Sequence, residues 1–218
     1  MYTKKKGLFI VLEGVDGSGK TYHGKKLYLK LKKNNLPVEY TREPGGTNTS
    51  ESIRKVILNN KKINRYTETF LYFACRSEHL EKRIYPGLKK NKIIICDRFL
   101  DSTLAYQGAG FGINQNAVLT MHNLIANKLR PDLTILLKLN TKNIKSRLIN
   151  RKSNNKYDFL KKKFYKMVNN AFSTLSKKAG YLVINSSMSR GVNERIIFDK
   201  VINIIKKKYE IRRKFKFQ

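Results

Sequence analysis

The hydrophobic positions of this chain fall into five short apolar runs separated by longer amphipathic segments. The runs occupy residues 8–12, 38–41, 93–96, 133–137 and 181–184. Short apolar runs alternating with helical patterns are typical of a parallel sheet with helices on both faces. From about residue 192 to 213, isoleucine and valine recur at helical spacing and predict a C-terminal helix with one buried face. The pattern predicts an α/β fold, a doubly wound domain with a five-stranded parallel sheet.

The amino-acid composition is consistent with one domain over residues 1–218. The chain is 40% hydrophobic, enough for a substantial core, and shows no compositional break that would mark a linker. No apolar run approaches the roughly 18 residues of a membrane span, and the first is too short for a signal peptide. The only two cysteines, Cys75 and Cys96, are expected to be small buried residues. We therefore expect a cytoplasmic protein with no membrane partner.

The first apolar run leads into a glycine-rich segment that fits the pattern G-x-x-x-x-G-K-[ST]. The segment consists of Gly14, Val15, Asp16, Gly17, Ser18, Gly19, Lys20 and Thr21. Glycines let several backbone N–H groups point at one anion, and the helix that follows adds its positive end. Lys20 can reach the β- and γ-phosphates, and the Thr21 hydroxyl can hold Mg²⁺. The alternative is an ordinary strand-to-helix turn capped by Thr21, but the context favours ATP binding.

Two further polar clusters follow the second and third apolar runs. Ligands of open α/β sheets bind beyond the carboxyl ends of the strands, so both clusters should lie near the glycine-rich loop. Asp97 has the position of an acid that approaches Mg²⁺, and Arg98 can clamp a phosphate bidentately. Arg42 precedes a Pro-Gly-Gly turn, and with Arg98 it suggests a second anion site opposite ATP. The alternative interpretation of Asp97 and Arg98 is a surface ion pair. The alternative for the segment after Arg42 is a simple tight turn.

A base pocket is suggested by residues 68–76, which have a helical pattern. Tyr72 and Arg76 are four residues apart and therefore share one helix face, where a ring can stack and a guanidinium can bond a base. A core aromatic beside a solvated arginine is the commoner reading of that spacing. Tyr106 and Gln107 follow the Asp-Arg pair and could contact a sugar and base.

The formal net charge of +32 has two explanations. It could serve nucleic-acid binding or the attraction of anions. It could also reflect an AT-rich genome, which encodes much Lys, Asn and Ile. Basic residues are scattered along the chain, and the lysine runs 161–163 and 206–208 lie within amphipathic helical patterns. We favour the explanation that the charge reflects an AT-rich genome, and we expect no specific nucleic-acid partner.

Together these segments resemble thymidylate kinase of the bacterial type, in the order and spacing of that family. The resembling segments are residues 13–21, 41–47, 68–76, 97–99 with 105–108, and 130–134. The elements Thr-Arg-Glu-Pro-Gly-Gly-Thr and Asp-Arg-Phe…Ala-Tyr-Gln-Gly are more specific than the glycine-rich loop. The resemblance covers about residues 7–205. It implies the fold of P-loop nucleoside monophosphate kinases with a short helical lid, ATP and dTMP as substrates, and a homodimer.

The resemblance also implies roles at the phosphates and the sugar. Lys20 and Thr21 serve ATP and Mg²⁺. Asp16 contacts the sugar 3′-hydroxyl of dTMP, and Arg42 with Arg98 holds its phosphate.

Other matching residues are implied to recognise the nucleoside. Tyr72 stands where the family usually stacks a phenylalanine on thymine, and Arg76 matches the arginine that bonds the base. Tyr106 closes against the 2′ side of the sugar, and Gln107 lies near the base.

A lid at about residues 141–160 is implied to supply further cations. Arg147 and Arg151 match the first lid arginines, and a spacing of four places them on one helix face. The loop position Ser18 is not basic, so the added charge must come from elsewhere. The family's usual Asp-Arg-x-Glu is not intact, since Asp158 is followed by Phe159.

The expected reaction is ATP + dTMP → ADP + dTDP. Lys20, Arg98, Arg147 and Arg151 are the predicted catalytic cations around the transferred group, with Thr21 and Asp97 at the metal. Two alternatives are a deoxynucleoside kinase of the same fold, which needs a carboxylate base for a hydroxyl acceptor, and a nucleic-acid-binding NTPase.

Overall fold

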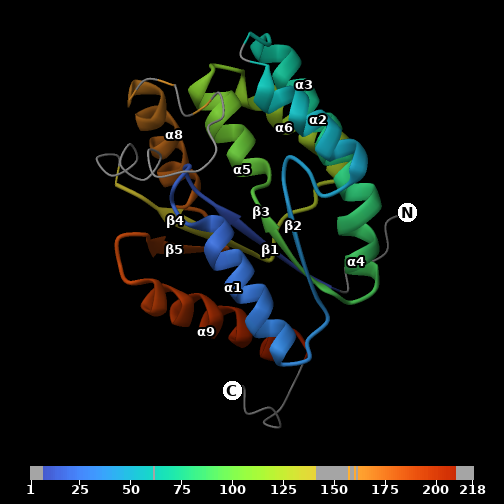
Figure 1. Ribbon diagram of the computed structural model, residues 1–218, viewed down its shortest axis with the longest axis vertical. Coiled ribbons are helices and arrows are strands. Elements are labelled where there is room, and N and C mark those ends of the chain that lie inside the picture. The colour runs from blue at the N-terminus through green and yellow to red at the C-terminus, as the bar shows by residue number, and fades with distance from the viewer. Residues whose placement is uncertain (1–6, 61, 141–156, 158–159, 161, 210–218) are drawn as a thin grey trace.

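The computed structural model describes residues 7–60, 62–140, 157, 160 and 162–209 of the 218-residue chain (Figure 1). Within these residues a parallel sheet has the strand order β2-β3-β1-β4-β5. The strands are β1 (Leu8–Glu13), β2 (Val38–Arg42), β3 (Ile93–Asp97), β4 (Leu133–Lys138) and β5 (Tyr181–Asn185). This is the fold predicted from the apolar runs.

Each strand continues one residue past the predicted end of its apolar run. The added residues are Glu13, Arg42, Asp97, Lys138 and Asn185. All five are polar, so the apolar runs in the sequence end at the residue before each of them. Because the strands are parallel, these residues lie along one edge of the sheet, where ligands of such folds bind.

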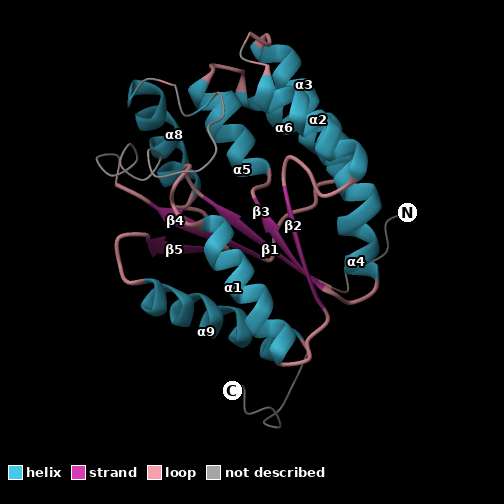
Figure 2. Ribbon diagram, viewed as in Figure 1, coloured by secondary structure: helices cyan, strands magenta, loops and turns pink. Residues whose placement is uncertain are grey.

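Helices cover both faces of the sheet (Figure 2). The longer ones are α1 (Lys20–Lys33), α2 (Asn48–Asn59), α3 (Arg65–His79), α6 (Gln115–Ala126), α8 (Lys162–Leu175) and α9 (Arg190–Lys208). Two short helices are α4 (Tyr85–Lys89) and α5 (Leu100–Thr103), and π-helical segments occupy Leu80–Ile84 and Leu104–Gly110.

The alternation of side chains along β1 divides the core into two layers. Leu8, Ile10 and Leu12 pack with apolar residues of α1 and α9 on one face. Phe9 and Val11 point to the other face, against apolar residues of α3, α4 and α6. The central strand is therefore buried on both sides, as expected for a parallel sheet.

The predicted C-terminal helix is α9, which runs over Arg190–Lys208. Its Ile197, Val201 and Ile205 are buried, whereas Ile196 is 37% exposed and lies off the buried face. Its last predicted residues, 210–213, lie outside the described part of the chain.

A third cluster packs α8 against the π-helical segment Leu104–Gly110. The ring of Tyr106 lies 6.0 Å from that of Phe164 and 6.3 Å from that of Phe172. These contacts hold Tyr106 at the rim of the sheet, beside the glycine-rich loop.

Candidate active site

The glycine-rich loop joins β1 to α1. Gly14, Gly17 and Gly19 have φ of 135°, 79° and 95°, conformations that residues with a Cβ rarely adopt. Thr47 caps the first turn of α2 by accepting a hydrogen bond from the Ser50 N–H, but no described side chain caps α1 in this way. The first N–H groups of α1 and its positive end therefore remain for an anion.

Lys20 lies inside this loop. Its Nζ donates to the carbonyl of Val15 at 2.9 Å, and the residue is only 5% exposed. Burial, reinforced by the charge of Arg98, lowers the pKa of Lys20 to about 8. A buried cation held by a backbone carbonyl is well suited to meet incoming phosphate.

Thr21 and Asp97 come together as the sequence predicts. The Thr21 hydroxyl donates to Asp97 Oδ2 at 2.5 Å, and Tyr40 donates to the same oxygen at 3.3 Å. Asp97 is buried at the end of β3. A hydroxyl and a carboxylate next to a phosphate-binding loop are the oxygen donors that Mg²⁺ prefers, so these residues fit the ion.

A second pocket opens on the other side of the loop, between β1, α2, α3 and the residues after β3. Its lining consists of Asp16, Glu43, Pro44, Arg54, Leu58, Tyr72, Arg76, Arg98, Phe99, Ser102, Thr103, Tyr106, Gln107 and Tyr157. It combines three arginines with aromatic rings and an amide, a composition suited to an anionic aromatic ligand such as a nucleotide.

Arg98 connects the loop with this pocket. Its Nη2 pairs with Asp16 Oδ1 at 2.8 Å, and its Nη1 donates to the Gly14 carbonyl and to Ser102 Oγ. Burial alone would lower the pKa of Arg98, but Tyr106 and Asp16 raise it well above its ordinary value. The guanidinium is therefore a fixed charge between the glycine-rich loop and the pocket, on a residue whose φ is 75°.

Tyr106 and Asp16 form the next part of the pocket. The Tyr106 hydroxyl donates to Asp16 Oδ2 at 2.9 Å and accepts from the Asp16 N–H at 3.1 Å. The ring of Tyr106 also lies against the Arg98 guanidinium, with 5.1 Å between the ring centre and the guanidinium carbon. The structure thus brings together Asp16, Arg98 and Tyr106, which the family resemblance implies contact dTMP.

The predicted base-recognition residues line the same pocket. Arg76 is 1% exposed, and its Nη1 is buried with no hydrogen-bond partner among the described residues. Tyr72 lies one helical turn earlier, and its hydroxyl is 2.9 Å from that of Tyr157. Gln107 donates to Glu68 at 2.9 Å and to Tyr157 at 3.3 Å. The burial of Arg76 shows that it is not a solvated surface arginine.

Arg42 is not among the residues that line this pocket. It pairs with Glu51 at 2.8 Å, and half of its side chain is exposed. Arg54 of α2 lines the pocket instead and donates to the Pro44 carbonyl at 2.7 Å. Sequence reasoning missed Arg54 because it is one polar position of an amphipathic helix, with no local motif to single it out.

Glu43, Glu68, His79 and Tyr157 were also not predicted as site residues. Tyr157 donates to Glu68, and Glu43 pairs with Arg76 at 2.8 Å. Each of these partners is distant in the sequence, which is why spacing alone does not reveal them. The predicted lid residues Arg147 and Arg151 lie outside the described residues.

A separate cavity of about 390 Å³ borders the glycine-rich loop, between α1 and the start of α9. Among its lining residues, three buried polar atoms have no hydrogen-bond partner in the described part of the chain: Ser18 Oγ, His23 Nδ1 and Asn193 Oδ1. Arg190 also lines the cavity, with its guanidinium 4.7 Å from the centre of the Tyr22 ring. Unpartnered polar atoms around a cavity of this size indicate a ligand with its own polar groups.

Glu13, the last residue of β1, holds the segment that follows β3. It is 1% exposed and accepts hydrogen bonds from the Phe99 N–H at 2.8 Å and from the Ser102 hydroxyl. Burial, with the nearby charge of Asp101, raises the pKa of Glu13 to about 7. Its oxygens therefore hold the segment that carries Arg98 instead of facing the pocket.

The parallel sheet, the glycine-rich loop and an arginine-lined pocket opposite it define a phosphate-loop kinase of the nucleoside monophosphate kinase class. A sequence model described as thymidylate kinase matches residues 12–197. The chain therefore belongs to the thymidylate kinase family.

Individual relatives agree with this family. A thymidylate kinase of Wolbachia pipientis wMel is 42% identical over 173 residues, covering 78% of this chain and 86% of that protein. One from Mycoplasmoides gallisepticum is 37% identical over 203 residues, covering 92% and 95%. The crystal structure of thymidylate kinase from Ehrlichia chaffeensis superimposes with a TM-score of 0.71 at 31% identity, covering 92% of this chain and 98% of that one.

Proposed function

We propose that this protein transfers the terminal phosphoryl group of ATP to dTMP, with Mg²⁺, and that the residues gathered around Arg98 carry out the transfer. The observation that carries the proposal is the placement of Arg98, which contacts the glycine-rich loop through Gly14 and lines the second pocket. Two nucleotides bound on either side of it would bring their phosphates together.

The chemical step needs little help from a base. A phosphate oxygen of dTMP attacks the γ-phosphorus of ATP, and the bond from that phosphorus to the β–γ bridging oxygen breaks as ADP leaves. No proton has to be removed from an anionic oxygen. Catalysis then depends on positioning and on neutralising charge, the tasks suited to Lys20 and Arg98.

The surroundings of Glu13 favour a monophosphate over a nucleoside as acceptor. A nucleoside hydroxyl needs a carboxylate base beside it, and Glu13 is the carboxylate that directly precedes the glycine-rich loop. Its oxygens are occupied by the N–H groups of Phe99 and Ser102 and by the Ser102 hydroxyl. Arg54 and Arg98, by contrast, supply the positive charge that a monophosphate needs.

Thr21 and Asp97 are the residues that would hold Mg²⁺. When bound there, the ion would neutralise phosphate charge and help to align the γ-phosphate. On the ATP side, the cavity edged by His23 and Asn193 is the proposed place of the adenine ring, whose polar edge could satisfy their unpartnered atoms.

In the acceptor pocket we assign the dTMP phosphate to Arg98 and Arg54. Asp16 and Tyr106 take the sugar, and Tyr72 stacks on the base. Arg76 Nη1 donates to a thymine carbonyl, and Gln107 lies beside the base. Arg42 would reach the ligand only after leaving Glu51, so we give it a smaller part than Arg54.

A coupled assay of ADP release tests this function. ADP release should require dTMP or dUMP, be faster with dTMP, and be slow with dCMP, dGMP and dAMP. Arg76 has no acceptor, so it meets the amino group of cytosine badly. Equal rates with dCMP would contradict the base assignment. ADP release without any monophosphate, stimulated by DNA, would instead favour a nucleic-acid-binding NTPase.

We also propose a homodimer that buries the outer face of α2, α3 and α6. α3 contacts both other helices, and the three lie side by side in Figure 1. Apolar side chains remain exposed on them, with Phe70 at 60% and Leu124 at 84%. Light scattering should give twice the monomer mass. Replacing Phe70 and Leu124 by Glu should give monomers, whereas Val192→Glu on α9 should not.

Among the described residues, no helix is long and apolar enough to cross a membrane. We propose the cytoplasm as the site of action because the reaction consumes ATP. Fractionation with antibody detection would test this assignment.

A further inference from the structure

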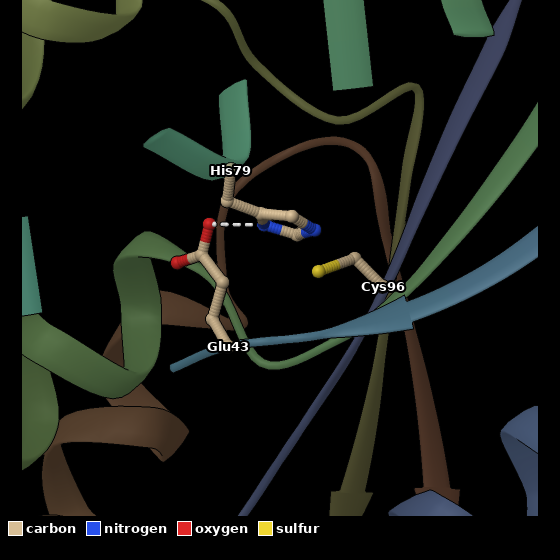
Figure 3. A group of neighbouring side chains, drawn as sticks. All are labelled: Glu43, His79 and Cys96. Carbon is tan, nitrogen blue, oxygen red and sulfur yellow. Dashed lines mark hydrogen bonds and ion pairs between the residues drawn. The ribbon is translucent and has the colours of Figure 1, made fainter. Parts of the chain in front are cut away.

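A series of buried polar side chains reaches the wall of the base pocket, which Glu43 and Arg76 line. Figure 3 shows two of its members, Glu43 and His79. Glu43 follows β2, and His79 is the last residue of α3. Glu43, His79 and Arg76 are 5%, 0% and 1% exposed. Burying one acid and two basic groups is costly unless each is paired, so their contacts should be specific.

Hydrogen bonds link Thr41 at the end of β2, through His79, to Glu43 at the pocket. Thr41 Oγ1 lies 2.6 Å from His79 Nε2, and His79 Nδ1 lies 3.1 Å from Glu43 Oε1. A carboxylate can only accept, so His79 Nδ1 carries a proton and donates it to Glu43. A Cβ at Gly46 would lie 2.6 Å from both His79 and Thr41, so the turn after β2 packs tightly over this pair.

This series of hydrogen bonds ends on Arg76, two of whose three nitrogens donate to protein oxygens. Arg76 Nε donates to Glu43 Oε2 at 2.8 Å, and Nη2 donates to Thr103 Oγ1 at 2.9 Å. The rings of Phe73 and Phe99 lie 5.4 and 5.0 Å from its guanidinium carbon. Only its Nη1 is buried without a partner among the described residues.

The same hydrogen-bonded side chains determine the charge of Glu43. Burial alone would raise the pKa of Glu43, but the charge of Arg76 and the hydrogen bond from His79 bring it below its ordinary value. Glu43 is therefore a carboxylate, and it gives Arg76 a fixed counter-charge at Nε.

Glu43, His79 and Cys96 also have ligand atoms within 4.8 Å of one another, a spacing that a metal site would require. Both carboxylate oxygens of Glu43 and both ring nitrogens of His79 already have protein partners. Burial raises the pKa of Cys96 well above its ordinary value, and its Sγ donates to the Arg98 carbonyl. A metal would have to displace Arg76, so we interpret the group as a support for Arg76.

We propose that Glu43 and His79 are positioning residues that determine base selectivity, because they hold the Arg76 guanidinium and leave its Nη1 for the ligand. This inference rests on the proposed function of the pocket. A guanidinium fixed at Nε and Nη2 cannot turn away from an unsuitable base. A cytosine amino group would then leave Nη1 unsatisfied, whereas a thymine carbonyl accepts from it.

The test is the ratio of kcat/KM for dTMP to kcat/KM for dCMP in Glu43→Gln. The neutral amide of this variant cannot balance the charge of Arg76 or accept from both neighbours, so the guanidinium should be less well held. We expect kcat/KM for dTMP to fall about tenfold and the ratio to fall about fivefold or more, with KM for ATP nearly unchanged.

Glu39→Gln is the matched control. Glu39 is also a carboxylate of the β2 region that is paired with a cation, Lys92, but it is partly exposed and does not line the pocket. Its substitution should leave the ratio unchanged. Thermal melting of each variant establishes that it is folded. A folded Glu43→Gln protein with the wild-type ratio would overturn the proposal.

His79 provides a second test in case Glu43→Gln does not fold. His79→Asn keeps an N–H group near Glu43, whereas His79→Leu removes it. The asparagine variant should keep more of the base selectivity than the leucine variant, and equal ratios in the two would contradict the proposal. The wild-type protein tests the proposed function separately. If the wild type does not phosphorylate dTMP, the proposed function is wrong; if it does and the variant ratios are equal, only the role of His79 and Glu43 is wrong.

Discussion

The two proposed nucleotide sites of this protein are built in different ways. The glycine-rich loop, the proposed ATP side, is formed largely by backbone: three glycines with positive φ and a start of α1 without a side-chain cap. The acceptor side is formed by side chains that already bind one another, such as Arg98 with Asp16 and Arg76 with Glu43. A backbone site recognises phosphate in any nucleotide, whereas a side-chain site can select one base.

This difference predicts where mutations act. Changes on the ATP side should reduce turnover with any acceptor. Changes on the acceptor side should alter KM for dTMP or the choice among monophosphates. The following variants test that division, beginning with the largest expected effect.

Lys20→Met should lower kcat by about 10²–10³-fold, because it removes a cation aimed at the transferred phosphate. The fold should remain, since an apolar side chain of similar length replaces a buried cation. Steady-state kinetics with dTMP and dUMP, with thermal melting, would measure both effects. Lys25→Met on the exposed side of α1 is the control. Near-normal turnover in a folded Lys20→Met protein would remove the distinction between the two sites.

Removing both Arg147 and Arg151 should lower kcat by roughly 30-fold or more with little change in dTMP affinity. The reason is the resemblance to lid arginines of the family and the absence of a basic residue at Ser18. Kinetics and dTMP titrations on single and double alanine variants measure this. Full kcat in the double variant would move the role to another lid cation, such as Lys152 or Lys156.

Arg54→Ala should raise KM for dTMP roughly tenfold, about 1.5 kcal/mol, because a hydrogen bond to a charged phosphate is lost. Arg42→Ala is the matched comparison, since Arg42 is paired with Glu51 outside the pocket lining. It should change KM for dTMP clearly less. A larger effect at Arg42 would show that it leaves Glu51 when the ligand binds.

The smallest expected effect is a pH dependence of stability from Glu13. Its folded pKa of about 7 lies above the ordinary value of 4.5, so the native state binds more protons than the unfolded state between these values. The contribution of Glu13 to stability is therefore present below about pH 4.5 and decreases as pH rises to about 7.

Glu13→Gln removes this dependence. The melting temperature of the wild type minus that of the variant should become less positive, or more negative, as pH rises from about 4.5 to 7. A difference that stays constant over this range would show that Glu13 does not titrate there. Glu39→Gln, at a partly exposed carboxylate, provides the reference.

Much of the fold could be predicted from the sequence because apolar runs and a glycine-rich loop are local signals. All five strands appear where the runs predict them. The acceptor pocket was predicted less fully. Glu43 and His79 are 36 residues apart, and Tyr157 is 89 residues from Glu68. The packing angles of two helices decide which of their polar residues face a shared cavity, and periodicity does not determine those angles. The sequence alone therefore does not distinguish Arg54 from the neighbouring polar residues of its helix.

The pairing of Arg98 with Asp16 has a consequence for competition by small anions. Any anion that approaches Arg98 must compete with a carboxylate that is already 2.8 Å away. Inorganic phosphate offers little to Asp16 in return, whereas a nucleotide brings a sugar hydroxyl group that can donate to it. The protein should therefore tolerate high phosphate and sulfate concentrations while still binding its nucleotide, and weak inhibition by both salts would be the measurable sign.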